Sequence, residues 1–431
     1  MRILPQGKYK NGEEVLMAKK SLKGIVCFSI FALFLISFFG WTIAARAGGD
    51  PALLDRTKQV APEILRDMEV LVNIDSPSDY GAGIAKVQDF VADKLKLLGA
   101  RIETFPGPKG AYNIAATFEG TGKGRILLMA HADTVFKQGT AAQNPFRIAD
   151  GRAYGPGVVD DRAGILAGLY ALRILNERGF RDFAKITFLI NCDEEVGSGS
   201  SKELIIKLGK EHDYAICLEG GRPGDGIVGS RKGTARMIVE VKGRASHAGN
   251  APYQGANALV ELAHQVLQLS KLADKEKGTS VSFTIFKAGD KLNVIPDHAE
   301  ARADVRVPTV QEFNRLDQGA KEIIKNKVVP DAEVKLSFTA GRPPYPSTPK
   351  GDALIAKAQN VYQEIGGHFK VEFSGGGSDG NYTAFAGTPT IDGMAFEGGN
   401  GHTDKEYMEI GSLSPRLYLL ARLLMELGSQ K

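Results

Sequence analysis

The sequence predicts an α/β protein in which a smaller βαββαβ domain is inserted into a larger domain. From about residue 60, short apolar segments alternate with amphipathic segments, which is typical of a sheet with helices on its faces. Near residue 233 this pattern gives way to a βαββαβ order, and it resumes near residue 343. A chain of 431 residues also exceeds one ordinary hydrophobic core, so two domains are expected.

The first part of the larger domain contains the segments that we expect to form its central strands. They are residues 125–130 (RILLMA), 185–192 (KITFLINC) and 213–218 (DYAICL). Each is short, apolar and bounded by polar or glycine residues, as buried parallel strands are. Between the first two, residues 163–178 carry apolar side chains at helical spacing, and Gly179 follows them as a candidate C-cap.

The inserted domain is predicted to span residues 233–342, which makes the larger domain discontinuous, at 48–232 and 343–431. Within the insert, we expect strands at residues 237–242, 281–287, 298–307 and 333–340, and helices at 257–272 and 310–325. This order corresponds to a compact split-βαβ unit. After the insert, we expect helices at residues 352–365 and 415–427 and an extended segment at 388–395.

Residues 1–47 are predicted to be an export signal. Lysines precede an uncharged apolar run at 24–45, and residues 45–47 (ARA) resemble a cleavage site. The run is long enough to span a bilayer, so an uncleaved membrane anchor is the alternative. Met17 begins a more usual signal than Met1, and both are candidate start residues. We expect a secreted or periplasmic protein, with membrane contact only if the signal is retained.

The net positive charge of the chain comes from this signal. The whole chain has a net charge of +4, but residues 1–47 contain seven Lys or Arg and two Glu, which leaves the remainder at −1. A nearly neutral body gives no electrostatic reason to expect nucleic-acid binding.

Two cysteines, Cys192 and Cys217, lie in predicted strands. Neighbouring strands would allow a disulfide in an oxidising compartment, but buried free thiols are the interpretation we favour. The sequence has no C-x-x-C spacing, so we assign neither cysteine to a metal.

Ligand-type side chains follow each predicted parallel strand. His131 follows the first of these strands, Glu194-Glu195 the second and Glu219 the third. In open α/β sheets, ligands bind beyond the carboxyl ends of the strands, so we expect these side chains at one edge. Imidazole nitrogen and carboxylate oxygen are donors that Zn²⁺ accepts. The sequence therefore predicts a metal-dependent hydrolase.

Acidic residues near these positions have candidate roles of their own. Asp133 forms an H-x-D pair with His131 and could orient its ring, or could only form a turn. Asp160 and Asp161 precede the helix predicted at 163–178. Asp161 has a role as helix N-cap available, which leaves Asp160 to bridge two cations.

The adjacent carboxylates of Glu194 and Glu195 are expected to differ in role. In extended backbone, successive side chains point to opposite sides, so one can bind a metal while the other faces water. A carboxylate beside metal ions can accept a proton from water, which makes Glu194 the candidate general base.

Seven segments occur in an order that is found in a known family: HADTVF, YGPGVVDDRAG, NCDEEVGS, CLEGG, GRASHAG, FSGGGSDGNY and GHTDKEY. In this order they resemble the M20 metallopeptidase family and, within it, the glutamate carboxypeptidase branch. Each segment alone is a weak signal, but the ordered set is specific. The resemblance implies a zinc-peptidase (phosphorylase/hydrolase-like) catalytic domain of the α/β class, with an inserted ferredoxin-like βαββαβ lid domain that also mediates dimerisation.

The resemblance also implies two Zn²⁺ ions per subunit, held by histidine and carboxylate side chains: one ion by His131 and Glu219, one by Glu195 and His402, and both by Asp160. Glu194 would be the general acid and base, and Asp133 would orient His131. His402 lies in a glycine-rich loop, and only the resemblance makes it a candidate ligand.

Residues that would bind the substrate are implied in the same way. His247, in the inserted domain, would reach the active site of a partner subunit and stabilise the oxyanion there. Asn293 and Arg342 would hold the terminal carboxylate of the substrate, a task that suits the planar guanidinium of arginine. Gly376 and Ser378 would offer backbone N–H groups to the same carboxylate.

The expected function is that of a dizinc exopeptidase that hydrolyses the amide bond before a C-terminal residue, which we expect to be glutamate. Its substrate would be a small peptide or N-acyl amino acid, and the protein would be a homodimer. One alternative is an aminoacylase or N-acyl-amino-acid deacylase that uses the same metals. Another is a metal-dependent binding protein without catalysis, which the presence of Glu194 argues against.

Overall fold

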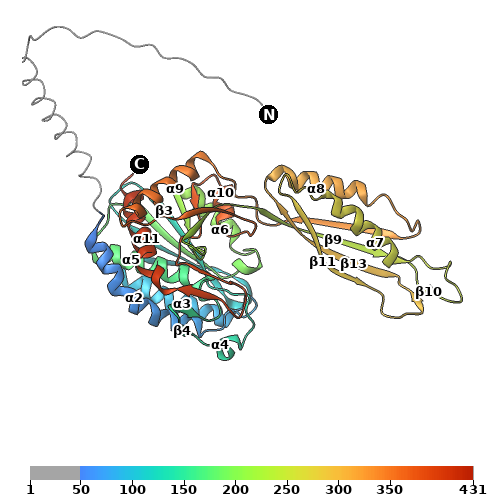
Figure 1. The fold of residues 1–431 in the computed structure, drawn as a ribbon, viewed down its shortest axis with the longest axis horizontal. Helices are drawn as coiled ribbons and strands as arrows, with labels where there is room; N and C mark the ends of the chain where they lie inside the picture. Colours follow the sequence, from blue (N-terminus) through green and yellow to red (C-terminus); the bar gives the residue numbers. More distant parts are fainter. Residues whose placement is uncertain (1–48, 431) are drawn as a thin grey trace, which may run out of the picture. The chain divides into compact units, whose positions relative to one another are not determined.

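The structure is a computed structural model that describes residues 49–430 (Figure 1). The predicted export signal at residues 1–47 lies outside the described residues, and so does the choice between its cleavage and its retention. Within the described part of the chain, no helix is long and apolar enough to cross a membrane.

A six-stranded sheet forms the centre of the larger domain, in the order β1-β2-β6-β3-β7-β16. Its strands are β1 (Arg101–Pro106), β2 (Tyr112–Glu119), β3 (Arg125–His131), β6 (Lys185–Asn191), β7 (Tyr214–Cys217) and β16 (Thr390–Ile391). β3 pairs in parallel with β6 and β7, and β16 pairs in parallel with β7. The three central strands predicted from the sequence are therefore confirmed as β3, β6 and β7.

Both faces of β3 are buried. Ile126, Leu128 and Ala130 belong to the main hydrophobic core, whereas Leu127 and Met129 belong to a smaller core. Successive side chains of a strand point to opposite faces, so these two sets lie on opposite sides of the sheet. This explains why the segment is continuously apolar rather than alternating, because a sheet covered on both faces needs apolar residues on both.

Helices cover both faces of this sheet (Figure 1). The helices of the larger domain are α2 (Pro51–Val72), α3 (Gly81–Leu97), α4 (Thr140–Gln143), α5 (Arg162–Glu177), α6 (Lys202–Glu211), α9 (Pro349–Gln363), α10 (Gly380–Phe385) and α11 (Leu413–Gly428). α5 and α11 contact β3 and each other, and α2 packs against both. α6 and α10 contribute to the smaller core on the other face. The helices predicted in these regions are confirmed as α5, α9 and α11.

The ends of α5 follow from local chemistry. The carboxylate of Asp161 caps the helix by accepting a hydrogen bond from the N–H of Gly164 at 3.0 Å. Gly179, beyond the other end, has φ 63°, a left-handed conformation that glycine adopts without strain. Asp161 is therefore the N-cap, as predicted, and Asp160 is left for another role.

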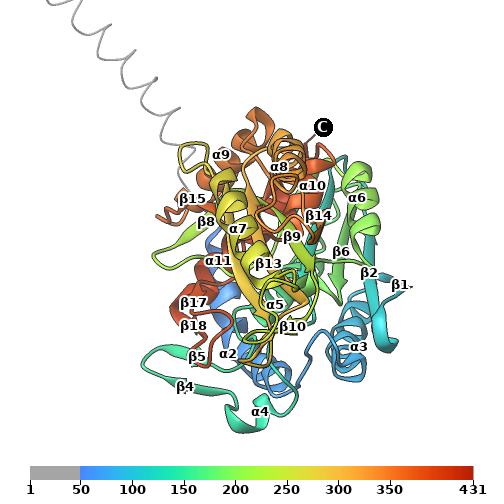
Figure 2. The same ribbon diagram turned by 90° about the vertical axis from the view of Figure 1, so that its right-hand side faces the viewer.

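The inserted segment contains the predicted βαββαβ order. Its elements are β9 (Gly233–Lys242), α7 (Ala258–Leu269), β11 (Ser280–Ala288), β13 (His298–Val307), α8 (Val310–Ile323) and β14 (Glu333–Ala340). The strands form an antiparallel sheet in the order β11-β13-β9-β14, on which α7 and α8 pack side by side (Figure 2). Its core is separate from the two cores of the larger domain. The predicted boundaries at 233 and 342 stay a prediction.

Smaller elements complete the structure. They are β4 (Arg147–Ala149), β5 (Arg152–Tyr154), β8 (Gly226–Arg231), β10 (Ser246–His247), β12 (Val294–Ile295), β15 (Lys370–Ser374), β17 (Gly398–Gly399) and β18 (Tyr407–Glu409), with 3₁₀ turns η2 (Pro108–Gly110), η3 (Glu194–Val196), η4 (Ser270–Leu272) and η5 (Ile410–Ser412). β18 pairs with β5 in a small sheet. This pairing brings the loop before β18 beside the segment that follows β5.

The segment predicted to be extended at 388–395 contains only the short strand β16. Gly393, with φ 71°, turns the chain away from the strand direction. Cys192 and Cys217 are free and buried, which confirms the interpretation as thiols. They lie on opposite flanks of β3, at the ends of β6 and β7, so they are not on neighbouring strands.

His212, which follows α6, is buried in its neutral form. Its Nδ1 donates to the carbonyl oxygen of Leu208 at 2.6 Å, and its Nε2 accepts from the hydroxyl of Thr187 at 2.9 Å. Burial lowers the pKa of His212 to about 4. A histidine in an unfolded chain has a pKa of about 6.5. Between about pH 4 and pH 6.5, His212 is therefore protonated in the unfolded chain but neutral in the folded protein.

We expect this histidine to make the fold sensitive to acid. As the pH falls below about 6.5, the unfolded chain takes up the proton first, so stability is lost until about pH 4. The free energy of unfolding should fall by about 2 kcal/mol between pH 7 and pH 5 because of this group. Urea unfolding at both pH values should show a smaller loss in H212N than in the wild type. The control H368N changes an exposed histidine and should behave like the wild type; equal losses in all three proteins would contradict the prediction.

Candidate metal centre

The parallel register places the predicted ligands at one edge of the central sheet. β3 ends at His131, and its last residues pair with the last residues of β6 and β7. The segments that follow β6 and β7 carry Glu194-Glu195 and Glu219. In two overlapping groups the ligand atoms lie within 4.8 Å of one another: His131 with Glu194 and Glu219, and His131 with Asp160 and Glu195. The expected convergence at the carboxyl ends of the strands is therefore observed.

Asp160 lies between two histidines. Its Oδ1 is 3.0 Å from Nε2 of His131, and its Oδ2 is 3.0 Å from Nε2 of His402. Nε2 of His402 is also 3.2 Å from Oε2 of Glu195. His402 has φ 66°, an uncommon conformation for a residue with a side chain. The two oxygens of Asp160 thus face the two halves of the predicted site, as a bridging ligand requires.

The charge of the cluster fits a bound cation. Burial, followed by the charge of Asp160, raises the pKa of Glu219 to about 7, and burial raises the pKa of Glu194 and Glu195. Oε1 of Glu195 is buried and has no hydrogen-bond partner. A buried carboxylate needs a partner or a metal. The nitrogen and oxygen donors present match those that Zn²⁺ prefers.

Asp133 is fully buried and holds two parts of the centre. Its Oδ1 is 3.3 Å from Nδ1 of His131 and accepts the N–H of Glu194 at 3.0 Å. Its Oδ2 accepts the N–H of Glu195 at 3.1 Å. Although burial disfavours a charged imidazole, Asp133 and Asp160 outweigh it and raise the pKa of His131. The sequence predicted that Asp133 orients His131, but it did not predict the hydrogen bonds from the backbone of η3 to Asp133.

The backbone of Glu194 and Glu195 differs from the prediction. These residues form the 3₁₀ turn η3 rather than an extended segment. The N–H groups of a 3₁₀ turn's first residues have no partner within the turn, and Asp133 supplies one. The two side chains therefore diverge because of the turn, and not because of strand alternation.

Glu406 is a site residue that sequence reasoning missed. It is buried and accepts the backbone N–H groups of Gly157, Val159 and Asp160 at 3.2, 2.9 and 3.1 Å. Burial, with the charge of Asp160 second, raises its pKa to about 8. Glu406 thereby joins the backbone of Asp160 to the loop that carries His402. Glu406 lies in the GHTDKEY segment, which was the only signal that could have found it, because an acidic residue in a polar loop has no periodic pattern that reveals burial.

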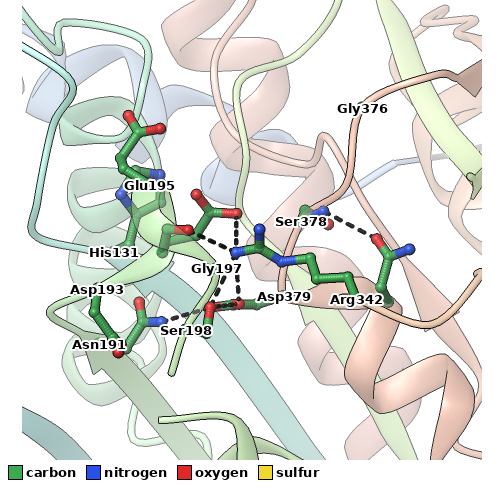
Figure 3. A network of polar contacts seen from close by, with 12 residues as sticks. His131, Asn191, Asp193, Glu195, Gly197, Ser198, Arg342, Gly376, Ser378 and Asp379 are labelled. Carbon is green, nitrogen blue, oxygen red and sulfur yellow. Dashed lines mark hydrogen bonds and ion pairs between the residues drawn. The ribbon is translucent and has the colours of Figure 1, made fainter. Parts of the chain in front are cut away.

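The side chain of Arg342 contacts Glu194, the candidate general base. Its Nη2 is 2.7 Å from Oε1 of Glu194. The same nitrogen is 3.4 Å from Oδ1 of Asp379 (Figure 3). The guanidinium therefore already binds carboxylate oxygens, and its predicted contact with the carboxylate of a substrate stays a prediction.

Gly376 and Ser378 lie in the loop after β15, and the N–H groups of both already have acceptors in the elements that flank the loop. The N–H of Gly376 donates to Oγ of Ser374 at 3.2 Å, and that of Ser378 donates to Oδ1 of Asn381 at 2.9 Å. A substrate carboxylate would have to replace these acceptors, so the predicted contact is not formed in this arrangement of the loop.

His247 and Asn293 lie near each other in the inserted domain. β10, which ends at His247, pairs with β12, and the N–H of Ala248 donates to the carbonyl oxygen of Asn293 at 2.9 Å. Nδ1 of His247 accepts the N–H of Gly249 and of Asn250. Among the described residues, no hydrogen bond or ion pair joins these two side chains to the metal ligands, so their roles stay predictions.

Histidine and carboxylate donors beyond the carboxyl ends of parallel strands, with a buried carboxylate beside them, define a metal-dependent hydrolase. The model of peptidase family M20/M25/M40 matches residues 127–426, and the chain belongs to this family. The resemblance seen in the ordered motifs is thereby confirmed.

Relatives with known names support this placement. Carboxypeptidase G2 from Pseudomonas sp. (strain RS-16) is 38% identical over 408 residues, which cover 94% of this chain and 98% of that protein. Acetylornithine deacetylase from Photorhabdus laumondii subsp. laumondii is 30% identical over 263 residues, or 56% of this chain and 66% of that protein. The crystal structure of a tripeptidase from Staphylococcus aureus has a TM-score of 0.75 at 22% identity and covers 86% of this chain and 99% of its own. This last similarity concerns the fold.

We expect the substitution Glu406→Gln to weaken metal binding. The amide can keep its oxygen toward the N–H groups of Val159 and Asp160, but it then turns an N–H donor toward the N–H of Gly157. The segment from Gly157 to Asp160 should therefore shift. Substitutions of residues that support metal ligands typically lower metal affinity by about 10- to 100-fold. Competition with a chelator would measure this. Glu409→Gln, which removes a surface ion pair with Arg152 in the same region, is the control; equal metal affinity in both variants would contradict the prediction.

Proposed function

We propose that the protein is a secreted dizinc exopeptidase that hydrolyses the amide bond before a C-terminal glutamate. The observation that carries this proposal is the buried carboxylate of Glu194, which lies within ligand distance of His131 and Glu219. A binding protein has no need of a proton acceptor there. The similarity to carboxypeptidase G2 over nearly the whole chain supports the reaction class.

Two Zn²⁺ ions are the proposed cofactor. His131 and Glu219 would hold one ion, Glu195 and His402 the other, with Asp160 shared. The two oxygens of Asp160, each 3.0 Å from a different histidine, support this division. When bound, zinc supplies a Lewis acid that polarises a carbonyl group and acidifies water.

Glu194 moves the protons of the reaction. Its carboxylate would take a proton from the attacking water and then deliver it to the nitrogen of the leaving amine. Burial raises the pKa of Glu194, which helps it to keep the proton between the two steps. Asp133 fixes the backbone N–H of Glu194, so the carboxylate starts from a defined position.

The substrate would be held at its C-terminal end. Arg342, Asn293 and the loop of Gly376 and Ser378 would bind the terminal carboxylate, since a guanidinium pairs with both oxygens of such a group. His247 is exposed on the inserted domain, as a residue that reaches a partner subunit must be, and it would stabilise the oxyanion in a homodimer.

A second candidate function is the deacylation of N-acyl amino acids. The similarity to acetylornithine deacetylase favours it, and it would use the same ligands and the same base. The two candidate functions differ in the part of the substrate that is recognised: the C-terminal glutamate in the first, and the N-acyl amino acid in the second.

Glu194→Gln should abolish turnover without releasing the metal. The amide cannot accept the proton, so we expect kcat to fall by at least about 100-fold. Metal content and steady-state rates of the purified variant would be measured together. Wild-type-like turnover would reject the role of Glu194 as base, and loss of one ion from the variant would make Glu194 a ligand instead.

A substrate panel should separate the two candidate functions. We expect the highest kcat/KM for acyl-glutamates and lower values for dipeptides that end in other residues and for N-acetyl amino acids. The released amino acid would be quantified for each compound at equal enzyme and zinc concentrations. Faster turnover of N-acetyl-ornithine than of any acyl-glutamate would favour the deacylase.

A further inference from the structure

Arg342 lies where the inserted segment returns to the larger domain. Its backbone N–H donates to Oγ1 of Thr234 at 3.0 Å, and its carbonyl oxygen accepts the N–H of Thr234 at 2.9 Å. Thr234 belongs to β9, the first strand of the insert. These backbone bonds therefore hold Arg342 to the insert rather than to the central sheet. Its side chain alone reaches the metal centre.

The guanidinium of Arg342 is enclosed by the larger domain. Nη2 donates to Oγ of Ser198 at 3.0 Å, in addition to its contacts with Glu194 and Asp379 (Figure 3). Gly377 leaves room for the side chain, since a Cβ there would lie 3.0 Å from Cδ of Arg342. The larger domain thus holds the guanidinium of Arg342, whereas the backbone of Arg342 is bonded to the inserted segment.

Asp379 is the charged member of this enclosure. It is 4% exposed, and Arg342 is the only cation within ion-pair distance of it in the described part of the chain. Its Oδ1 accepts a hydrogen bond from the hydroxyl of Ser198, and its Oδ2 accepts from the amide of Asn191 at 2.6 Å. Asn191 is the last residue of β6, directly before the segment that carries Glu194. Asp379 is therefore hydrogen-bonded to the end of the strand that leads to the turn of Glu194.

Ser198, whose hydroxyl contacts both Asp379 and Arg342, has an unusual backbone conformation. Its φ is 57°, in the left-handed region, and it is fully buried. Such a conformation costs about 1 kcal/mol or more for a residue with a side chain, and it persists where the surroundings impose it. In this conformation the hydroxyl of Ser198 lies between Asp379 and Arg342.

We propose that Asp379, together with Ser198, positions Arg342 for the terminal carboxylate of the substrate and so sets the preference for a free carboxylate. This inference rests on the proposed function, in which Arg342 binds that carboxylate. An arginine side chain loses considerable rotamer freedom when it is held. Because Asp379 holds Arg342 before the substrate arrives, this loss does not weaken substrate binding. Asp379 is a positioning residue, since it acts through Arg342.

The test compares Asp379→Asn with the wild type on two substrates. One is an acyl-glutamate, and the other is the same compound with its α-carboxylate converted to a carboxamide. Asparagine keeps the size and an acceptor oxygen but removes the charge. The amide of Asn191, whose Nδ2 now donates to Asp379, can turn over so that its Oδ1, which has no partner, accepts from the new amide. The fold should therefore be retained.

We expect the variant to discriminate less between the two substrates. The ratio of kcat/KM for the acid to kcat/KM for the carboxamide should fall by about tenfold, the usual scale for loss of a charge-assisted contact. The fall in this ratio should come chiefly from a higher KM for the acid, as expected when its carboxylate is bound less tightly. Glu261→Gln, which alters a buried carboxylate of the inserted domain, is the control and should keep the wild-type ratio.

The outcomes separate this inference from the proposed function. In one outcome, Asp379→Asn keeps the wild-type preference for the acid over the carboxamide, while Arg342→Met loses it. That result would overturn the inference and leave the proposed function standing. An equal fall of kcat/KM on both substrates would also overturn it, because a purely structural role predicts that result. A wild type that does not discriminate would reject the proposed function itself.

Ser198→Gly provides a second test that does not depend on the stability of Asp379→Asn. Glycine adopts φ 57° without strain, so the turn should form, but the hydroxyl between Asp379 and Arg342 is removed. We expect a smaller fall in the same ratio, about two- to fivefold. A ratio equal to that of the wild type would overturn the proposal.

Discussion

The structure depends on balancing negative charge at one edge of its central sheet. The parallel order of β6, β3 and β7 brings carboxylates together where burial makes each of them costly. The protein meets part of this cost with its own groups: backbone N–H groups bond Asp133 and Glu406, and the guanidinium of Arg342 pairs with Glu194. The remaining charge, on Asp160, Glu195 and Glu219, explains why a divalent cation belongs in the site.

Much of this arrangement could be predicted from the sequence because it follows from periodicity and local chemistry. Continuous apolar segments bounded by polar residues identified β3, β6 and β7, and the rule that ligands bind beyond strand ends identified His131 and Glu219. Asp161 could be separated from Asp160 because a residue just before a helix has a capping role. The βαββαβ order of the insert followed from the spacing of its apolar residues.

The parts that could not be predicted involve loops that meet only in three dimensions. Glu406 and Asp379 lie in polar, glycine-containing segments, where buried and solvated carboxylates look alike in sequence. His402 has no periodic pattern around it and became a candidate only through the family motifs. The 3₁₀ turn at Glu194 depends on Asp133, which is remote in the chain, so no local propensity could reveal it.

The contact of Asp160 with both His131 and His402 has a consequence for how the chain is held together. These histidines are separated by most of the catalytic chain, yet both lie 3.0 Å from one carboxylate. Closing a loop of that length costs on the order of 5 kcal/mol of chain entropy, which the folded protein has already overcome. A cation bound there would act as a reversible cross-link between the end of β3 and the loop of His402, so chelation should weaken the contact between these two segments as well as stop the chemistry.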